Sequence, residues 1–209
     1  MDRQQVRTWF GEATTGFTDT VGQITPDRLD DPALGDWSIR ALLGHTTRAF
    51  LTIENYLAPG PELRTDEQFL GPVGYFRAAL ASIGDPAEVS ARGVAAGDAL
   101  GAEPLEAALA VAARVTALVE ATDDDATVQS PVGPLRLIDY LSTRAFELTV
   151  HSLDLAQAIG AEPGPDLERA ARPAIELAAA LAEPEDAVHV LRAITGRGGL
   201  AEVFTVLDG

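Results

Sequence analysis

The first segment of the chain carries a single apolar stripe at helical spacing. Its apolar side chains recur every three or four residues, at Val6, Phe10, Ala13, Phe17, Val21 and Ile24. Positions with this period lie on one face of an α-helix, and that face packs against a core. The pattern therefore predicts an amphipathic helix from Arg3 to about Ile24.

Three more long helices are predicted from the same period and from their boundary residues. The first runs from about Ile39 to Leu57, and Ser38 stands before it as an N-cap. The second covers Pro104 to Ala121, where leucine, alanine and valine recur at helical spacing. The third runs from about Leu137 to Ile159 and ends at Gly160, as expected for a C-cap glycine.

The middle of the chain predicts smaller elements. A stop at Pro59-Gly60 is followed by an expected turn from Thr65 to Leu70, a helix from about Val73 to Ile83 and a short helix after Pro86. The stretch ATVQSPVGPLRL contains a Pro-Val-Gly-Pro turn and predicts either a small hairpin or an ordered loop.

Two further helices are predicted near the end, at about Leu167 to Ala182 and about Glu185 to Ala193. The apolar EVFTVL segment is expected to be a short strand or a tucked-in coil. No repeat or low-complexity linker divides the chain, so we expect one domain over 1–209, with 196–209 as a short C-terminal tail. The predicted fold is all-α: the four long helices form a four-helix bundle, and the shorter elements decorate it.

Composition supports packed helices and narrows the partners. Hydrophobic residues make up 46% of the chain and aromatic residues only 6%, which favours helices over sheets. The formal net charge of −17 would repel nucleic acid and anionic membrane surfaces, so neither is an expected partner. The opening MDRQQVRTWF is polar, and no stretch approaches the roughly 18–20 apolar residues of a membrane span. We therefore expect a cytoplasmic, soluble protein.

Two missing residue types limit the chemistry. Cysteine is absent, which excludes disulfides, a protein thiolate nucleophile and sulfur ligands for a metal. All 15 basic residues are arginine, which excludes Schiff-base and lysine-base chemistry. Any metal must therefore be held by His, Asp or Glu.

Histidine and glutamate one helical turn apart indicate a metal site. Glu147 and His151 are four residues apart in the last long helix, so they point from the same face. His45, in the second long helix, is the natural third ligand. Together they would form a facial His/Glu/His set with open coordination positions, which is typical of catalytic metal sites.

Each of these residues also has a simpler interpretation. Glu147 and His151 at this spacing would form a hydrogen bond on a helix surface without any metal, and His45 would be a half-buried histidine bonded to a backbone carbonyl. Their context favours the metal, because both Glu147 and His151 interrupt a largely apolar helix. An ionised glutamate buried there needs a cation or a hydrogen-bond partner.

Other polar groups are weaker candidates. Asp154, one turn beyond His151, is expected either to orient a ligand or an approaching group, or to bond to a loop. His189 is expected to be structural or on the surface, and TGRGG predicts a turn because it does not connect a strand to a helix. A triad of Ser152, His151 and Asp154 is implausible, because adjacent helical side chains point about 100° apart.

Three segments resemble a known family. DWSIRALLGHTTRAF resembles the W-[ST]-x-x-x-[LV]-x-x-H helix of the mycothiol-dependent maleylpyruvate isomerase family, within the DinB/YfiT-like metalloenzymes. RLIDYLSTRAFELTVHSLDLAQAIG resembles its E-x-x-x-H-x-x-D helix, and VLRAITGRGG resembles the close of its bundle domain. The resemblance covers both ends of the bundle in the right order.

This resemblance implies a DinB-like four-helix bundle that binds one divalent metal, usually zinc, through His45, Glu147 and His151. It also implies mycothiol as thiol cosubstrate, which fits a chain without cysteine. The metal would lower the pKa of the thiol, and the thiolate would attack an electrophilic carbon. Arg40 and Arg144 are candidate anchors for an anionic substrate, since guanidinium binds carboxylate with two hydrogen bonds; solvent-facing salt bridges are their alternative role.

One departure affects the expected reaction. Known maleylpyruvate isomerases of this group carry a distinct C-terminal domain, whereas a short tail follows Gly196 here, so we expect an S-transferase or a family member with another substrate. A metal-assisted hydrolase on the same bundle and a metal-binding module without catalysis are the alternatives. The expected partners are a small-molecule electrophile and a thiol, and a homodimer is left open.

Overall fold

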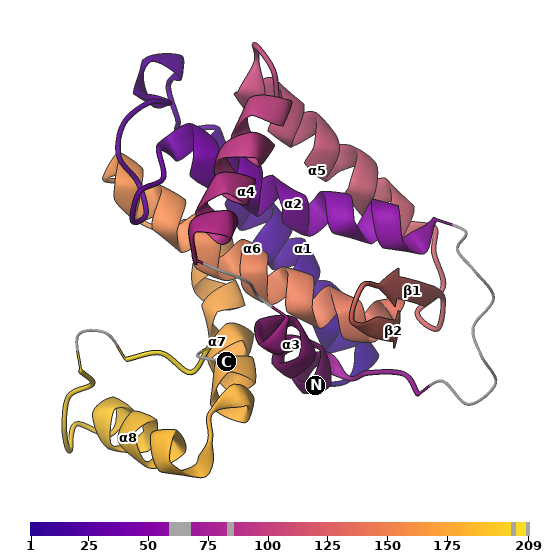
Figure 1. The fold of residues 1–209 in the computed structure, drawn as a ribbon, viewed down its shortest axis with the longest axis vertical. Coiled ribbons are helices and arrows are strands. Elements are labelled where there is room, and N and C mark those ends of the chain that lie inside the picture. The colour runs from indigo at the N-terminus through magenta and orange to yellow at the C-terminus, as the bar shows by residue number, and fades with distance from the viewer. Residues whose placement is uncertain (59–67, 83–85, 202–203, 208–209) are drawn as a thin grey trace.

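The computed structural model describes residues 1–58, 68–82, 86–201 and 204–207, and these residues are mainly helical (Figure 1). In chain order the elements are α1 (Arg3–Val21), the 3₁₀ turn η1 (Pro26–Arg28), α2 (Ile39–Leu57), α3 (Pro72–Ala81), α4 (Pro86–Ala99), α5 (Pro104–Glu120), β1 (Thr127–Ser130), β2 (Gly133–Arg136), α6 (Leu137–Ile159), α7 (Pro165–Leu181) and α8 (Pro184–Ile194). The predicted all-α fold is confirmed. The expected stop at Pro59-Gly60 and most of the expected turn over 65–70 lie outside the described residues.

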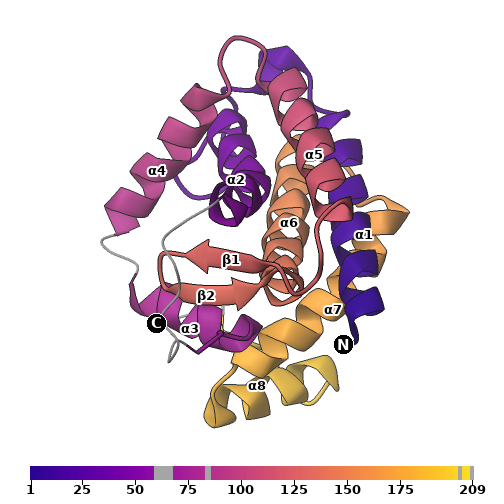
Figure 2. The same ribbon diagram turned by 90° about the vertical axis from the view of Figure 1, so that its right-hand side faces the viewer.

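The four long helices predicted from the sequence, α1, α2, α5 and α6, pack against one another. Helix α6 contacts α1 and α2, and α2 also contacts α4 and α5. Figure 2 shows α2 and α6 side by side between α4 and α5, with α8 at the edge of the molecule. None of the described helices is long and apolar enough to cross a membrane.

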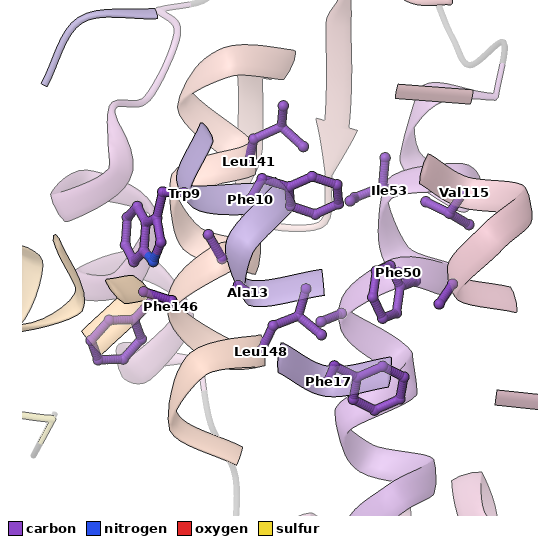
Figure 3. Packing of buried hydrophobic residues seen from close by; sticks show 14 of the residues in the cluster. Trp9, Phe10, Ala13, Phe17, Phe50, Ile53, Val115, Leu141, Phe146 and Leu148 are labelled. Carbon is purple, nitrogen blue, oxygen red and sulfur yellow. The ribbon is translucent and has the colours of Figure 1, made fainter. Parts of the chain in front are cut away.

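The core lies where α1, α2 and α6 meet (Figure 3). The rings of Phe10 and Phe17 from α1 pack against Phe50 of α2, with ring centroids 6.1 and 5.4 Å apart. The indole N–H of Trp9 donates a hydrogen bond to Oγ1 of Thr149 on α6 at 3.3 Å, so its one polar atom is satisfied inside the core. Burying a large apolar side chain contributes about 1.5–3 kcal/mol, so the α1 stripe holds the two site-bearing helices together.

The predicted helix boundaries at Ser38 and Gly160 are confirmed. The side chain of Ser38 accepts a hydrogen bond from the N–H of Ala41 at the start of α2. Gly160 has a φ of 68°, and its left-handed conformation ends α6. The N–H of the following Ala161 then donates to the carbonyl of Ala156 at 2.9 Å, which satisfies a carbonyl at the helix end. Residues beyond α6 are thereby turned back toward the bundle.

Three elements differ from the prediction. Helix α1 ends at Val21 instead of Ile24, because the N–H groups of Gln23 and Ile24 bond to carbonyls three residues back. Helix α4 has 14 residues, so it is longer than the short helix that the sequence predicts after Pro86. Helix α7 does more than decorate the bundle, because it buries Leu167, Ala170 and Leu177 and contacts both α1 and α6.

Helices α2 and α4 approach each other through glycines. A Cβ added to Gly44 would lie 2.2 Å from the backbone nitrogen of Gly97, and one added to Gly97 would lie 2.7 Å from the carbonyl oxygen of Arg40. Neither position has room for a side chain, so the backbones of the two helices are in contact. This contact holds α4 beside the residues that follow Ser38.

Of the two alternatives for 126–137, the hairpin is correct. Strands β1 and β2 pair antiparallel, with Ser130 opposite Gly133 and Pro131 and Val132 in the turn. Strand β1 contacts α2 and α6, so this turn lies at the same end of the two helices as α3 (Figure 2). In the EVFTVL segment, the described residues 204–207 form no strand.

We expect Gly44→Ala to lower the free energy of unfolding by about 1–3 kcal/mol, because the added methyl group forces α4 away from α2. The matched control is Gly11→Ala in α1, where an added Cβ has no neighbour within 4 Å. This control should leave stability unchanged or raise it by about 0.5–1 kcal/mol, since alanine favours a helix. Urea denaturation followed by circular dichroism measures both, and equal stability of the two variants would contradict the close approach.

Candidate metal centre

Three residues from two helices converge in the structure: His45 on α2, and Glu147 and His151 on α6. One ligand atom from each lies within 4.8 Å of the others, and all three residues are half-buried. The rings of the two histidines meet edge to face, with centroids 4.8 Å apart. The packing of α2 against α6 thus brings together the residues that the sequence nominated as metal ligands.

The two ligands on α6 are held by contacts along one helix face. Oε2 of Glu147 lies 3.3 Å from Nε2 of His151, at the expected four-residue spacing. Oδ2 of Asp154 lies 3.0 Å from Nδ1 of the same imidazole. In the protonated imidazole, Nδ1 donates to Asp154 and Nε2–H faces Glu147; loss of the Nε2 proton would free its lone pair for a metal beside Glu147. Asp154 therefore orients His151 in the way that carboxylates orient metal-binding histidines.

His45 is positioned by Trp37. The rings of Trp37 and His45 are 4.6 Å apart and tilted by 37°. The indole N–H of Trp37 donates to the carbonyl of Ser90 on α4 at 3.0 Å. A Cβ on Gly93 would lie 2.4 Å from the indole ring, so α4 lies directly against this side chain. Trp37 therefore links α4 to the imidazole of His45.

The electrostatics of the site favour a cation. Burial, followed by the positive charge of His151, lowers the pKa of His45 to about 4, so this imidazole is neutral at neutral pH. Burial acts against the ionisation of both Glu147 and His151. It is outweighed for Glu147 by the hydrogen bond from His151 and the charge of Arg144, and for His151 by the hydrogen bonds to Asp154 and then to Glu147. The pKa of Glu147 is thereby lowered to about 2 and that of His151 raised to about 9. A proton on His151 thus supplies the positive charge that a metal ion would replace.

The residues present fit a divalent metal. Nδ1 of His45 is buried and has no hydrogen-bond partner among the described residues, so a lone pair or an N–H is left unsatisfied in the interior. Two imidazoles and one carboxylate suit Zn²⁺ and related first-row ions. Three protein ligands leave coordination positions for water, thiol or substrate, which is the arrangement of a catalytic site.

A cavity of about 640 Å³ adjoins the three residues. Its wall is formed by α2 and the segment before it, by α3, α4 and α6, by the hairpin turn and by the C-terminal tail. The described lining residues are Leu34, Trp37, His45, Arg48, Ala49, Thr52, Tyr56, Tyr75, Phe76, Ala79, Leu80, Ser82, Val89, Arg92, Pro131, Val132, Arg144, Glu147, His151 and Leu207. Most of this wall is apolar or aromatic, as is usual for small-molecule sites. The candidate ligands are therefore accessible to a molecule in the cavity.

Only one of the two arginines that the sequence suggested as substrate anchors lines the cavity. Arg144 lines the cavity beside Glu147. Arg40 does not, and its Nη1 instead donates to the carbonyl of Gly101 at 3.2 Å. His189 is exposed on α8, apart from the candidate ligands.

Sequence reasoning missed the contributions of α3 and α4 to the site. Tyr75 of α3 lines the cavity, and its hydroxyl accepts a hydrogen bond from Nη2 of Arg144 at 3.3 Å. Gly93 and Gly97 of α4 permit the contacts with Trp37 and α2. The glycines were a visible signal, since a helix rarely carries two without a packing reason. Nothing local in the sequence identified their partners.

One of the comparisons with known proteins found a match. A family model described as the mycothiol maleylpyruvate isomerase N-terminal domain matches residues 10–156. This range contains His45, Glu147, His151 and Asp154, whereas the VLRAITGRGG segment lies beyond it. No curated protein and no solved structure matches the chain.

We expect the protein, loaded with Zn²⁺ and freed of excess ion, to retain about one ion per chain. His45→Ala and Glu147→Gln should each abolish this retention, because two ligands do not hold the ion against dialysis. The matched control is His189→Ala, which removes the exposed histidine of α8 and should bind zinc as the wild type does. Elemental analysis measures the content, and near-stoichiometric zinc in both ligand variants would contradict the site.

Asp154→Ala is expected to weaken zinc binding by about 10- to 100-fold, because the imidazole of His151 loses the carboxylate that orients it. Glu185→Ala, at an exposed position of α8, removes the same charge away from the site and should leave the affinity unchanged. Competition against a chelating indicator gives both dissociation constants. Equal affinities for the two variants would show that Asp154 has no positioning role.

Proposed function

The chain belongs to the mycothiol maleylpyruvate isomerase N-terminal domain family, and we propose that it is a metal-dependent enzyme that uses mycothiol for S-transfer to a small electrophile or for its thiol-assisted isomerisation. The observation that carries this proposal is the convergence of His45, Glu147 and His151 on a cavity large enough for a small organic molecule. The absence of cysteine adds support, because the protein itself offers no sulfur nucleophile. Zinc is the metal that this donor set suits best.

A bound divalent ion would lower the pKa of a nearby thiol and so provide thiolate at neutral pH. The side chains of the protein supply the rest. Asp154 keeps His151 in one orientation, and Trp37 does the same for His45. The apolar wall formed by Phe76, Leu80 and other residues excludes water from the reacting groups.

The bond changes differ between the two outcomes. In S-transfer, the thiol sulfur forms a bond to carbon as the leaving group departs with its electron pair, and the thiol proton goes to solvent. In isomerisation, the sulfur adds to a conjugated double bond, the resulting single bond rotates, and elimination of the same thiolate restores the double bond. Both outcomes need a site that holds thiol and electrophile together, which raises their effective concentration.

The proposal is tested by assaying zinc-loaded protein with mycothiol and a general electrophile such as monobromobimane. We expect adduct formation above the uncatalysed rate, and a loss of at least about 100-fold in Glu147→Gln, because removing the metal forfeits several kcal/mol of stabilisation. His189→Ala should retain the wild-type rate.

Two other outcomes would overturn the proposal. Hydrolysis of ester or amide substrates by the zinc-loaded protein in the absence of thiol would assign a metal-assisted hydrolase. Full zinc occupancy without turnover of any thiol and electrophile pair would assign a metal-binding module. In either case the metal centre would stand and the thiol chemistry would not.

A further inference from the structure

The cavity beside the candidate metal centre contains a buried arginine, Arg144, whose guanidinium contacts no carboxylate of the described residues, although Glu147 lies one turn along the same helix. Arg144 is only 8% exposed and lies on the cavity wall. Its Nε donates to Oγ1 of Thr143 at 3.0 Å and its Nη2 to the hydroxyl of Tyr75 at 3.3 Å. No carboxylate of the described residues forms an ion pair with it. A buried guanidinium in this state carries a large desolvation cost unless an anion completes the site.

Tyrosine rings hold this guanidinium in place. Cζ of Arg144 lies 4.8 Å from the ring centroid of Tyr140 and 5.3 Å from that of Tyr75. These cation–π contacts offset part of the desolvation cost and fix the orientation of the planar group, but they provide no negative charge. Two of the three guanidinium nitrogens have acceptors, on Thr143 and Tyr75, and no described residue accepts a hydrogen bond from Nη1. This nitrogen is therefore left for a ligand in the cavity.

The charges that line the cavity are opposite to those of the whole protein. The chain has a formal net charge of −17, yet the described residues of the cavity wall include Arg48, Arg92 and Arg144 and, among them, Glu147 as the one acidic side chain. Arg48 is half-buried on α2, and no described residue forms a hydrogen bond or ion pair with it. A wall with an excess of positive charge in an acidic protein attracts an anion.

A divalent ion would increase this imbalance. The described residues that line the cavity include three arginines and one glutamate, so a bound divalent ion would add two charges to an existing excess of positive charge in a partly buried site. A thiolate would neutralise one of these charges, and an anionic second substrate would neutralise another.

The rest of the cavity wall suits an apolar body. Phe76, Leu80 and Val89 line it from α3 and α4, and Val132 and Leu207 line it from the hairpin turn and the tail. The volume of about 640 Å³ exceeds what a short-chain acid would fill. The wall therefore combines one anchoring region for an anion with a broad apolar surface.

We propose that Arg144, with Arg48 beside the same cavity, binds the carboxylate of an organic acid whose apolar or aromatic body contacts Phe76, Leu80 and Val89. Guanidinium groups bind carboxylates with two parallel hydrogen bonds, which makes carboxylate the anion of choice for a planar, stacked arginine. This inference rests on the proposed function in one respect: it makes the organic acid the electrophilic substrate. The binding itself requires neither metal nor thiol.

The test compares benzoate with benzyl alcohol, its uncharged analogue, by isothermal titration calorimetry of the full chain. The measurement uses wild-type protein and His45→Ala, in which the metal ligand is missing. We expect benzoate to bind at least about tenfold more tightly than benzyl alcohol in both proteins, as a charge-assisted pair of hydrogen bonds predicts. A preference present only in zinc-loaded wild type would assign the carboxylate to the metal and overturn the role of Arg144.

Four variants test whether the preference for benzoate comes from Arg144 itself or from the positive charge of arginines in general. In Arg144→Gln and Arg48→Gln the preference for benzoate should be lost and reduced, respectively. Arg172→Gln, at a highly exposed position of α7 outside the cavity, is the control and should keep it. Circular dichroism shows whether the Arg144→Gln protein folds. Arg144→Lys keeps the positive charge but loses the paired N–H donors of the guanidinium group, so it should show an intermediate preference for benzoate.

Either of two results would overturn the inference: equal binding of benzoate and benzyl alcohol to the wild type, or an equal loss of preference in Arg172→Gln and Arg144→Gln. A protein that binds benzoate through Arg144 but forms no mycothiol adduct would retain this inference and reject the proposed function. The two conclusions therefore fail separately.

Discussion

The position of α2 between α6 and α4 is the constraint on which the candidate site depends. Helix α2 carries His45, and its contact with α6 places that imidazole opposite Glu147 and His151. On its other side, the glycines at 44 and 97 let the backbones of α2 and α4 meet. The second contact supports the first, because α4 holds Trp37 against the ring of His45. A tightly packed interior transmits such contacts, so the geometry of the site depends on glycines that do not line it.

The charge around the candidate site is opposite in sign to the net charge of the protein. The surface carries a large excess of carboxylates, whereas the cavity wall presents arginines and a histidine whose pKa is raised to about 9. Glu147 is the counter-charge that makes this arrangement tolerable, since it lies one turn from both Arg144 and His151. Binding of a cation at Glu147 would therefore change the charge balance around Arg144 on the same helix face. Metal and organic anion are expected to favour each other by this route.

Much of the fold could be predicted because its signals are local. The boundaries of α2 and α6 follow from Ser38 and Gly160, whose cap interactions involve residues within a few positions of each. The apolar stripe of α1 predicted its helix but not its early end at Val21. Helix α7 was underestimated because its spacing of buried leucine and alanine predicts an apolar face but not which helices cover that face, and only contact with α1 and α6 shows that it belongs to the core.

The sequence by itself determined the possible ligands. With no cysteine, a metal could be held only by nitrogen and oxygen, and the spacing of Glu147 and His151 placed both on one helix face regardless of the rest of the fold. The tertiary structure alone decided which distant groups join them. It brought His45 within reach, placed Trp37 and α4 behind it, and set Arg144 on the cavity wall while Arg40 bonds elsewhere. The physical reason is that helix periodicity orients side chains within one element, whereas contacts between elements depend on how packed surfaces fit, and no local pattern encodes that fit.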